Sequence, residues 1–594
     1  MPTPTEQQRI IHVRRRPPTA KGLDAASYRC IGMWKRAPWR KRELSSCAER
    51  IDQIRDLYSD LKDGDLNERL IEFKRERKAH PDNVDGSLEE GLALLAVVAH
   101  RELGQSPYRV QLMAAAALAR GFLLEVDTGE GKTLALALTA AFQGWTGLPC
   151  HVITANDYLA GRDAKNLGAF YKRAGLSVDS VLGDTEEEER RKAYRCSVTY
   201  TTAKEVAADF LRDRLRLRGL EESGSRLALA NIAAIGRAPA QKPVQRGLYF
   251  GLIDEADNAL IDEAVTPLII SRNLEAGELE HACSAAWDYS SRLVKGSDYE
   301  VNTSRKSIET ESGHLEQVAE EWELSGSRLW TSVRRRAELL RLALEAREFF
   351  HRDQQYVIEK DKVVIVDEST GRPMPMRTWR QGLHQMIEAK EGVTLSGASE
   401  TMARLSFQDF FRKYQDLAGA SGTVKEVASE IWFTYGLPIL AIPRNLPNCG
   451  QFLGWRFFPD EESKAASIRE EVMVRHARGQ PVLVGVRSVD ASETVAELLA
   501  DRRLHCHVLN AKYHREEALM VSQAGKRSRI TIATNMAGRG TDILLDTNVH
   551  DLGGLHVVAS EPHESARVDR QLYGRAARHG DPGSVLAMYS AEDQ

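Results

Sequence analysis

Residues 121–133 read Gly-Phe-Leu-Leu-Glu-Val-Asp-Thr-Gly-Glu-Gly-Lys-Thr, and this stretch decides the fold of the chain. An apolar run leads into a short loop that holds two glycines, and the helix-forming run Leu-Ala-Leu-Ala-Leu-Thr-Ala-Ala follows at residues 134–141. Strand, loop and helix in this order place backbone N–H groups around a phosphate at the helix N-terminus. Because Val126 stands where the strict G-x-x-x-x-G-K-S/T motif has glycine, the prediction of a phosphate loop needs support from other segments.

The residues of this loop have the chemistry needed to bind ATP and Mg²⁺. The two glycines let the backbone close on the phosphates, and Lys132 supplies a charge to the β- and γ-phosphates. The hydroxyl of Thr133 is a ligand that Mg²⁺ prefers. The candidate nucleotide-binding residues of the loop are Thr128, Gly129, Glu130, Gly131, Lys132 and Thr133.

Bulk properties limit the class of protein. The 594 residues predict about three or four domains, and 42% hydrophobic with 28% charged residues is typical of a globular protein. A net charge of −4 gives no bulk argument for nucleic-acid binding. The seven cysteines form no C-x-x-C pair, which disfavours disulfides and structural zinc. No apolar run spans a bilayer and no signal-peptide pattern begins the chain, so we expect a cytoplasmic location.

The first 47 residues are polar and basic, with Arg14-Arg15-Arg16 and Arg40-Lys41-Arg42 as the densest clusters. One interpretation is a partly disordered tail. The other is an arm that contacts anionic membrane lipids, since each basic residue near such a surface contributes about 1 kcal/mol. The sequence leaves both open.

Helical patterns precede the loop, and alternating strands and helices follow it. Gln111, about twenty residues before Lys132, is a candidate reader of the adenine edge, although the residue alone also fits a surface glutamine. Short strands are predicted at 151–154, 177–181 and 197–200, which indicates a doubly wound sheet. The charged run at 186–191 is predicted to be a solvated helix face.

A second decisive stretch, Leu-Tyr-Phe-Gly-Leu-Ile-Asp-Glu-Ala-Asp, occupies residues 248–257. It predicts a buried strand that ends in adjacent carboxylates. Asp254 would hold Mg²⁺ through water, and Glu255 would orient or deprotonate the attacking water. An acidic pair can also be a simple helix cap, but together with the phosphate loop the hydrolytic interpretation is favoured.

The composition changes between about 271 and 391, where charged helices and a hairpin-like pair of strands around 355–367 indicate an inserted domain. A second α/β pattern starts near 438, with strands predicted at 481–485, 506–509, 530–533 and 555–558. It ends in Gln-Leu-Tyr-Gly-Arg-Ala-Ala-Arg at 571–578, where Arg575 and Arg578 share a helix face. These arginines could be fingers that stabilise charge on the γ-phosphate, or a solvated basic face.

The motifs together resemble the SecA family of protein-export ATPases over about residues 104–593. The shared stretches include Val-Asp-Thr-Gly-Glu-Gly-Lys-Thr at 126–133, Thr-Ala-Asn-Asp-Tyr-Leu-Ala at 154–160 and Leu-Ile-Asp-Glu-Ala-Val-Thr-Pro-Leu-Ile-Ile-Ser at 260–271. Val-Asp-Glu-Ser-Thr-Gly-Arg at 366–372, Gly-Leu-His-Gln at 382–385, Glu-Ala-Lys-Glu-Gly at 388–392 and Asn-Ala-Lys at 510–512 also match. Several of these stretches have no counterpart in nucleic-acid helicases.

The resemblance implies an α/β fold of two RecA-like nucleotide-binding domains, a P-loop NTPase with a DEAD-box helicase-like motor. The first domain would comprise 48–271 and 392–437, a preprotein-crosslinking domain would be inserted at 272–391, and the second domain would comprise 438–594. By position in the family motifs, Gln111 would read adenine, and Arg539 and Asp542 would contact the nucleotide. Arg575 and Arg578 match the arginine-finger positions.

The resemblance also implies partners: an unfolded preprotein as substrate, the SecYEG channel, and the cytoplasmic face of the inner membrane. A full-length SecA or a second copy of the chain is a further candidate partner. The sequence stops at Gln594, so we expect a short form without the helical scaffold, two-helix finger, wing and zinc-binding tail of typical members. A helicase-like ATPase acting on nucleic acid, or a regulatory ATP-binding partner of a full-length SecA, are the alternatives.

Four departures from the family pattern stand out. Asp127 replaces a basic residue in the phosphate loop, and Gly-Ala-Ser-Gly-Thr at 419–423 replaces Gly-Met-Thr-Gly-Thr. Arg-Asn-Leu-Pro at 444–447 replaces Thr-Asn-Arg-Pro, and Ala577 replaces a glycine. The carboxylate of Asp127 puts a negative charge near the phosphates.

Overall fold

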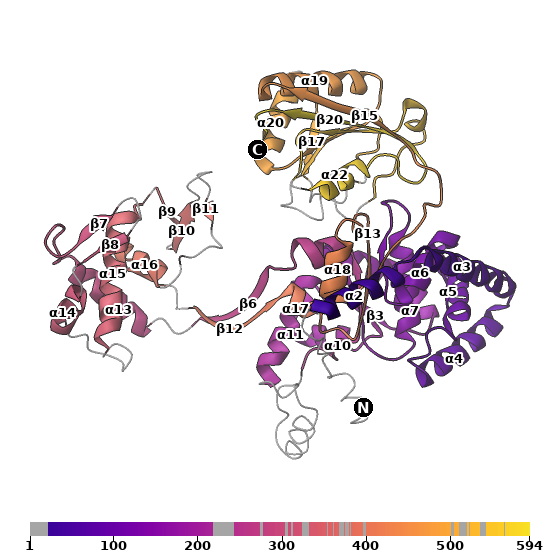
Figure 1. Ribbon diagram of the computed structural model, residues 1–594, viewed down its shortest axis with the longest axis horizontal. Helices are drawn as coiled ribbons and strands as arrows, with labels where there is room; N and C mark the ends of the chain where they lie inside the picture. The colour runs from indigo at the N-terminus through magenta and orange to yellow at the C-terminus, as the bar shows by residue number, and fades with distance from the viewer. Residues whose placement is uncertain are drawn as a thin grey trace, which may run out of the picture. The chain divides into compact units, whose positions relative to one another are not determined.

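The computed structural model forms two compact units, one of residues 1–268 with 405–594 and one of 269–404. It describes residues 22–217, 243–273, 277–302, 307–310, 313–322, 332–352, 354–359, 362–366, 373–374, 379, 382–395, 399–500, 504–509, 520–521, 523–534, 542–563 and 565–593. The discontinuous first unit contains two α/β domains, and the second unit is an insertion within the sequence of the first of these domains (Figure 1).

The first domain is built on a seven-stranded parallel sheet with the order β14-β1-β13-β5-β2-β4-β3. Its strands are β1 (Leu123–Glu125), β2 (Cys150–Thr154), β3 (Val178–Ser180), β4 (Val198–Thr202), β5 (Phe250–Asp254), β13 (Asp416–Ser421) and β14 (Ile439–Ala441). Strands β2 and β4 are buried along their whole length, as expected for a parallel sheet with both faces covered. The doubly wound sheet predicted from the sequence is confirmed.

Helices surround this sheet, and the largest core lies under those on one face. They are α2 (Gly22–Lys35), α3 (Pro38–Ser59), α4 (Asp63–Ala79), α5 (Leu88–Leu103), α6 (Arg109–Ala119), α7 (Lys132–Gly144), α8 (Asp157–Asn166), α9 (Gly168–Arg173), α10 (Glu187–Tyr194), α11 (Ala203–Leu217), α17 (Phe407–Phe411) and α18 (Ala428–Tyr435). Helix α5 is apolar on most sides and buried, and the alanines of α6 let it pack closely on α7. This packing fixes the helix that carries the phosphate loop.

The charged run 186–191 is exposed at residues 186–189, as predicted for a solvated face, but not at Arg190. Arg190 is buried, and its guanidinium binds Glu205 at 2.8 Å and Asp209 at 3.0 Å. A charge inside a domain requires such partners, because an unpaired buried charge costs several kcal/mol. The prediction for this residue is therefore wrong, and the reason is a pair of carboxylates on α11 that the local charge pattern does not reveal.

The second domain contains a six-stranded parallel sheet with the order β15-β20-β19-β16-β18-β17. Its strands are β15 (Cys449–Phe458), β16 (Val482–Val486), β17 (Cys506–Leu509), β18 (Ile530–Thr534), β19 (Leu555–Ala559) and β20 (Pro582–Ser590). Helices α19 (Glu461–Ala477) and α20 (Val489–Ala500) lie on one side of the sheet, and α22 (Ala566–Tyr573) lies on the other (Figure 1). A 3₁₀ turn, η4 (His550–Leu552), precedes β19.

The insertion is mostly helical, with α13 (Gly277–Ser290), α14 (His314–Glu321), α15 (Val333–Phe349) and α16 (Leu383–Glu391). Strands β9 (Tyr356–Glu359) and β10 (Lys362–Val366) pair antiparallel, which confirms the predicted pair of strands there. The remaining strands are β6 (Pro267–Asn273), β7 (Glu300–Asn302), β8 (Ser307–Glu309), β11 (Pro373–Met374) and β12 (Ser399–Ser406). The domain boundaries at 272 and 391 stay a prediction.

Candidate nucleotide site

The phosphate loop connects β1 to α7, as its sequence predicts. Gly129 has φ +88° and Gly131 has φ +74°, both in the left-handed region that favours glycine. A Cβ on Gly131 would lie 2.1 Å from Nε2 of Gln111, so no other residue fits there without displacing that amide. The loop therefore has the backbone shape that a cradle of N–H groups requires.

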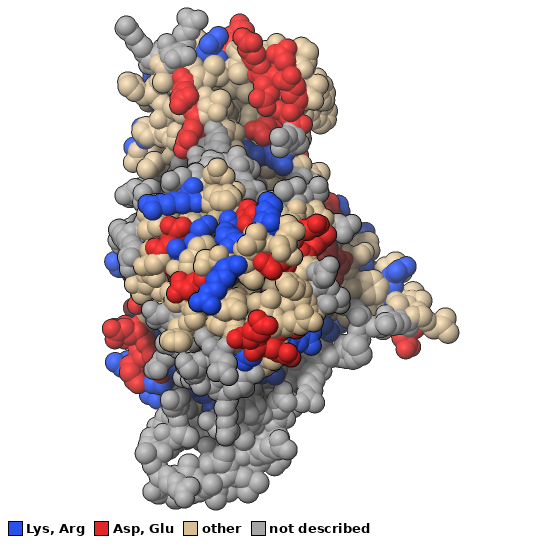
Figure 2. Space-filling view, turned by 90° about the vertical axis from the view of Figure 1, so that its left-hand side faces the viewer, with Lys and Arg blue, Asp and Glu red and all other residues tan. Residues whose placement is uncertain are grey.

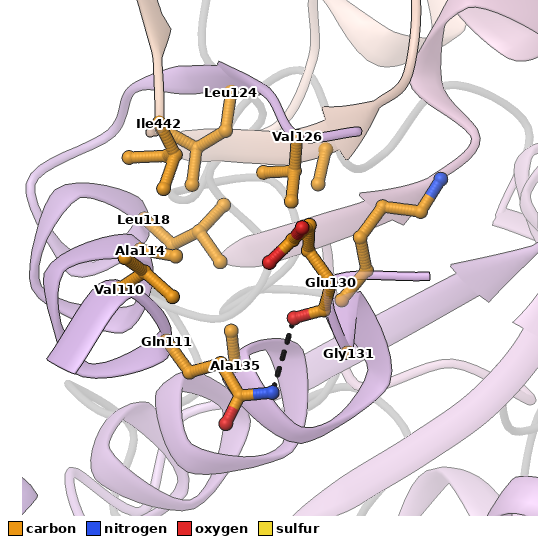
Figure 3. A pocket seen from close by; sticks show the side chains of 12 residues that line it. Val110, Gln111, Ala114, Leu118, Leu124, Val126, Glu130, Gly131, Ala135 and Ile442 are labelled. Atoms are coloured by element: carbon orange, nitrogen blue, oxygen red, sulfur yellow. Dashed lines mark hydrogen bonds between the residues drawn. The ribbon is translucent and has the colours of Figure 1, made fainter. Parts of the chain in front are cut away.

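Gln111 lies directly against this loop. It is buried near the start of α6, its Oε1 accepts a hydrogen bond from the backbone N–H of Tyr108 at 2.9 Å, and its Nε2 donates to the carbonyl of Glu130 at 3.0 Å (Figure 3). A cavity of about 10 Å³ beside it is lined mainly by apolar residues of α6, β1 and α7. The alternative of a surface glutamine is wrong, and the amide ties the predicted adenine reader to the phosphate loop.

The acidic pair faces the same loop from the end of β5. Lys132 Nζ donates to Glu255 Oε1 at 2.6 Å, and the backbone N–H of Glu255 donates to Asp254 Oδ1 at 3.0 Å. Burial raises the pKa of Asp254 well above its ordinary value, against the lowering effect of Lys132. Burial by itself would lower the pKa of Lys132, but the carboxylates of Glu255 and Asp254 outweigh it and raise that pKa. The carboxylates thus favour the charged form of Lys132 where a triphosphate would lie, whereas burial disfavours the charged form of Asp254.

The backbone of Glu255 is strained, with φ +52° in a residue that is not glycine. Such conformations cost of order 1–3 kcal/mol and concentrate at functional sites. A π-helical turn, η2 (Asn258–Asp262), follows immediately, and turns of this kind are frequent at functional sites too. Both features mark this strand end as a functional position.

Thr133 and Asp254 fit a Mg²⁺ ion that keeps several waters. Thr133 lies in the first turn of α7 and offers a hydroxyl, and Asp254 offers a half-buried carboxylate at the end of β5. Among the described residues there is no group of three or more His, Cys, Asp or Glu side chains placed to hold a metal. Mg²⁺ is usually bound through one or two protein ligands together with phosphate oxygens and water.

Helix α22 of the second domain reaches this site with charged side chains. Arg567 Nη1 binds Asp257 Oδ2 at 2.7 Å, and the same guanidinium binds Asp262. Gln571 Nε2 donates to Asp257 and, at 2.9 Å, to the hydroxyl of Thr423. Asp257 and Thr423 belong to the first domain, so this buried network joins the two α/β domains. Sequence reasoning assigned no role to Arg567 or Gln571; the polar spacing along α22 was the available signal.

The two predicted finger arginines follow α22. Arg575 is buried, and Arg578 Nη1 binds Asp542 at 2.7 Å, where His579 also binds. A Cβ on Gly129 would lie 3.0 Å from the Cβ of Arg578, so the backbone of the phosphate loop passes close to this arginine. Arg539 lies outside the described residues.

The second domain also touches the loop through its backbone. The hydroxyl of Thr128 donates to the carbonyl of Gly574. On the other side of the loop, Arg444 Nε binds Asp127 Oδ2 at 2.6 Å, and the backbone N–H of Asn445 donates to Glu130 Oε2 at 2.9 Å. The predicted residues of the loop, the acidic pair, Gln111, Asp542 and Arg578 are therefore brought together at one place.

A phosphate loop and an acidic strand end on one RecA-like domain, with arginines from a second such domain beside them, define a two-domain P-loop ATPase of the DEAD-like class. The family model of the SecA DEAD-like domain matches residues 32–432, and that of the SecA P-loop domain matches residues 456–550 and 545–594. The chain belongs to the SecA family, and it is an ATP-hydrolysing enzyme.

Curated relatives agree over nearly the whole chain. Protein translocase subunit SecA 2 of Chlorobium chlorochromatii is 41% identical and the match covers 100% of this chain and 89% of the relative. SecA 2 of Magnetococcus marinus is 41% identical over 97% of this chain and 89% of its own. Protein translocase subunit SecA of Methylococcus capsulatus is 38% identical over 93% of this chain and 62% of its own.

Proposed function

We propose that this protein couples ATP hydrolysis to the movement of unfolded secretory polypeptides through the SecYEG channel. The observation that carries the proposal is the nucleotide site between two α/β domains in a chain whose relatives are named protein translocase subunits. A site that is shared between domains can convert binding and hydrolysis into a change of domain contacts.

In the proposed cycle, Lys132 exchanges its bond with Glu255 for the phosphates of ATP. Glu255 would then be available to orient or deprotonate the attacking water, while Thr133 and, through water, Asp254 would hold Mg²⁺, which would neutralise charge on the phosphates. The ion pair between Lys132 and Glu255 at 2.6 Å supports this exchange, because each charge already lies where the other reactant would need it.

Arg575 and Arg578 are the proposed finger residues, and Asp542 positions Arg578 through their ion pair. Gln111 would bind the adenine base, and its hydrogen bond to the Glu130 carbonyl would couple base binding to the conformation of the phosphate loop. Arg539, outside the described residues, keeps its proposed contact with nucleotide by resemblance alone.

We propose that the protein acts at the cytoplasmic face of the membrane. Among the described residues, no helix is long and apolar enough to cross a bilayer. Helix α2 exposes the apolar side chains of Ile31, Met33 and Trp34 and also carries Arg29 and Lys35. Apolar and basic side chains on one helix favour binding at the surface of anionic lipids.

Nucleic acid is the less favoured substrate of such a two-domain ATPase. The net charge is −4, and Figure 2 shows basic and acidic side chains mixed over the middle of the visible face, with acidic side chains gathered over the second α/β domain. Proteins that bind a phosphate backbone without sequence preference present a basic groove.

ATP turnover measured with different additions tests the proposal. We expect turnover to rise when vesicles that contain SecYEG and an unfolded preprotein are added together, and we expect the preprotein to enter the vesicles. The proposal would be refuted if ATP turnover rose on addition of RNA or DNA and did not change on addition of the vesicles. Stimulation that requires a full-length SecA would instead assign this chain a regulatory role.

A further inference from the structure

The ion pair between Asp127 and Arg444 arises from the order of strands in the first sheet. Strand β1 lies beside β14 in parallel, with Glu125 opposite Ala441, and the N–H of Ile442 donates to the carbonyl of Glu125 at 2.9 Å. Neighbouring parallel strands leave a sheet at the same edge. The phosphate loop after β1 and the interdomain linker after β14, residues 442–448, therefore run side by side, and Asp127 meets Arg444.

Two contacts hold the linker on the loop. The guanidinium of Arg444 binds the carboxylate of Asp127 at 2.6 Å, and one residue later the N–H of Asn445 donates to the carboxylate of Glu130 at 2.9 Å. Each contact engages an acidic side chain that would otherwise stand close to the phosphates of a bound nucleotide. The linker thus neutralises one of these carboxylates and restrains the other.

The linker also touches the arginine-bearing turn of the second domain, residues 577–580. A Cβ on Gly580 would lie 2.9 Å from Leu446 Cδ1, and a Cβ on Gly450, at the start of β15, would lie 2.9 Å from the Cβ of Ala577. This turn carries Arg578, which binds Asp542. One short segment is therefore in contact with the phosphate loop on one side and with the finger turn on the other.

The two ends of the ion pair carry charges of opposite sign, an acid in the phosphate loop at 127 and an arginine in the linker at 444. Without Arg444, the carboxylate of Asp127 would repel the phosphates, since like charges a few ångströms apart interact unfavourably. Arg444 compensates this charge from a segment that is 317 positions away in the chain.

We infer that Arg444 is a positioning residue for ATP binding, which neutralises Asp127 within the phosphate loop and couples that loop through the linker to the turn that carries Arg578. The inference goes beyond the proposed translocation function, because it concerns nucleotide binding and needs neither a channel nor a preprotein. Failure of the translocation proposal would leave it standing.

Titration of the purified chain with a fluorescent ADP analogue tests the inference. Arg444→Ala leaves Asp127 uncompensated, and we expect Kd to rise about tenfold, which corresponds to about 1.4 kcal/mol. We expect Asp127→Ala combined with Arg444→Ala to recover most of the lost affinity, since the double variant has no charge to compensate. The reversed pair, Asp127→Arg with Arg444→Asp, should also bind more tightly than Arg444→Ala alone.

The control is Arg456→Ala, which breaks an ion pair between the exposed guanidinium of Arg456 and the mostly buried carboxylate of Glu471 on the second domain and should leave Kd unchanged. Raising the salt concentration should reduce the difference between Arg444→Ala and the unchanged protein, because exposed charges are screened. An Arg444→Ala variant with the affinity of the unchanged protein would overturn the inference. The inference would also be overturned if the change in binding free energy of the double variant equalled the sum of the changes in the two single variants. That result would show that the two charges do not interact.

Discussion

Arg567 gives the sharpest prediction about how the two α/β domains are held together. Its guanidinium binds Asp257 at 2.7 Å and also binds Asp262, and its side chain is 8% exposed while that of Asp257 is fully buried. Arg567→Ala would remove this guanidinium from the buried carboxylate of Asp257, to which Thr423 and Gln571 also donate. We expect the contact between the domains to weaken strongly.

The magnitude follows from the burial of the pair. Removing one partner of a buried ion pair costs about 3–5 kcal/mol, and the donors Thr423 and Gln571 remain on Asp257, so the lower end of about 3 kcal/mol applies. For a domain of this size each kcal/mol lowers the melting temperature by about 2–4 °C, so we expect a loss of roughly 6–12 °C. Differential scanning calorimetry should also show the second domain unfolding separately.

Arg570 on the same helix supplies a matched control. It binds Glu426 at 2.5 Å, with both side chains more than a third exposed, and lies at a longer 3.7 Å from the less exposed Glu125. An exposed pair such as that with Glu426 is screened by water and worth about 0–1 kcal/mol. Arg570→Ala should therefore change the melting temperature by less than about 4 °C. Equal losses in Arg567→Ala and Arg570→Ala would refute the reasoning, because burial would then not decide the effect.

Three further outcomes follow from the site. Glu255→Gln should keep ATP binding while hydrolysis falls by about 10²–10⁴-fold, and near-normal turnover in a phosphate-release assay would show the base misassigned. The hydrogen bond from His579 and the charge of Arg578 overcome the effect of burial and hold the pKa of Asp542 at about 2, while the bond to Asp542 raises the pKa of His579. The stabilisation from Asp542 is thus present above about pH 4 and is lost as the pH falls toward 2. The stabilisation from His579 is present below about pH 6.5 and is lost as the pH rises through its raised pKa. NMR titration of Asp542→Asn should therefore show a lowered pKa of His579, and an unchanged pKa would contradict this. Ala577 has φ +54°, so Ala577→Gly should relieve up to about 1 kcal/mol of strain, measured by urea unfolding, and a destabilised variant would argue that its contact with Gly450 matters more.

Local patterns predicted most of the elements that carry the site. The apolar runs before Asp254 and before the phosphate loop became buried parallel strands, because a strand covered on both faces must be apolar along its length. Gly129 and Gly131 predicted a loop that only glycine can form. These features depend on a few neighbouring residues, which is why the sequence reveals them.

Local patterns do not predict contacts between segments that are distant in the sequence. Asp127 and Arg444 lie 317 positions apart, and each looked like an isolated departure until the pairing of β1 with β14 brought them together. The burial of Arg190 escapes local patterns for the same reason, because its partners Glu205 and Asp209 lie on the following helix, α11. Pairing of this kind depends on the strand order, which periodicity does not specify.

The strand order also has a consequence for how the protein is made. The strand that carries the phosphate loop, β1, is bordered by β13 and β14, both of which follow the insertion in the chain. At synthesis rates of about 5–20 residues per second, roughly a quarter of a minute to a minute separates the emergence of β1 from that of its neighbours. During that time the apolar edges of β1 remain without partners on the ribosome, so the nascent first domain should be a client of chaperones and acquire nucleotide binding only after residue 441 has left the exit tunnel.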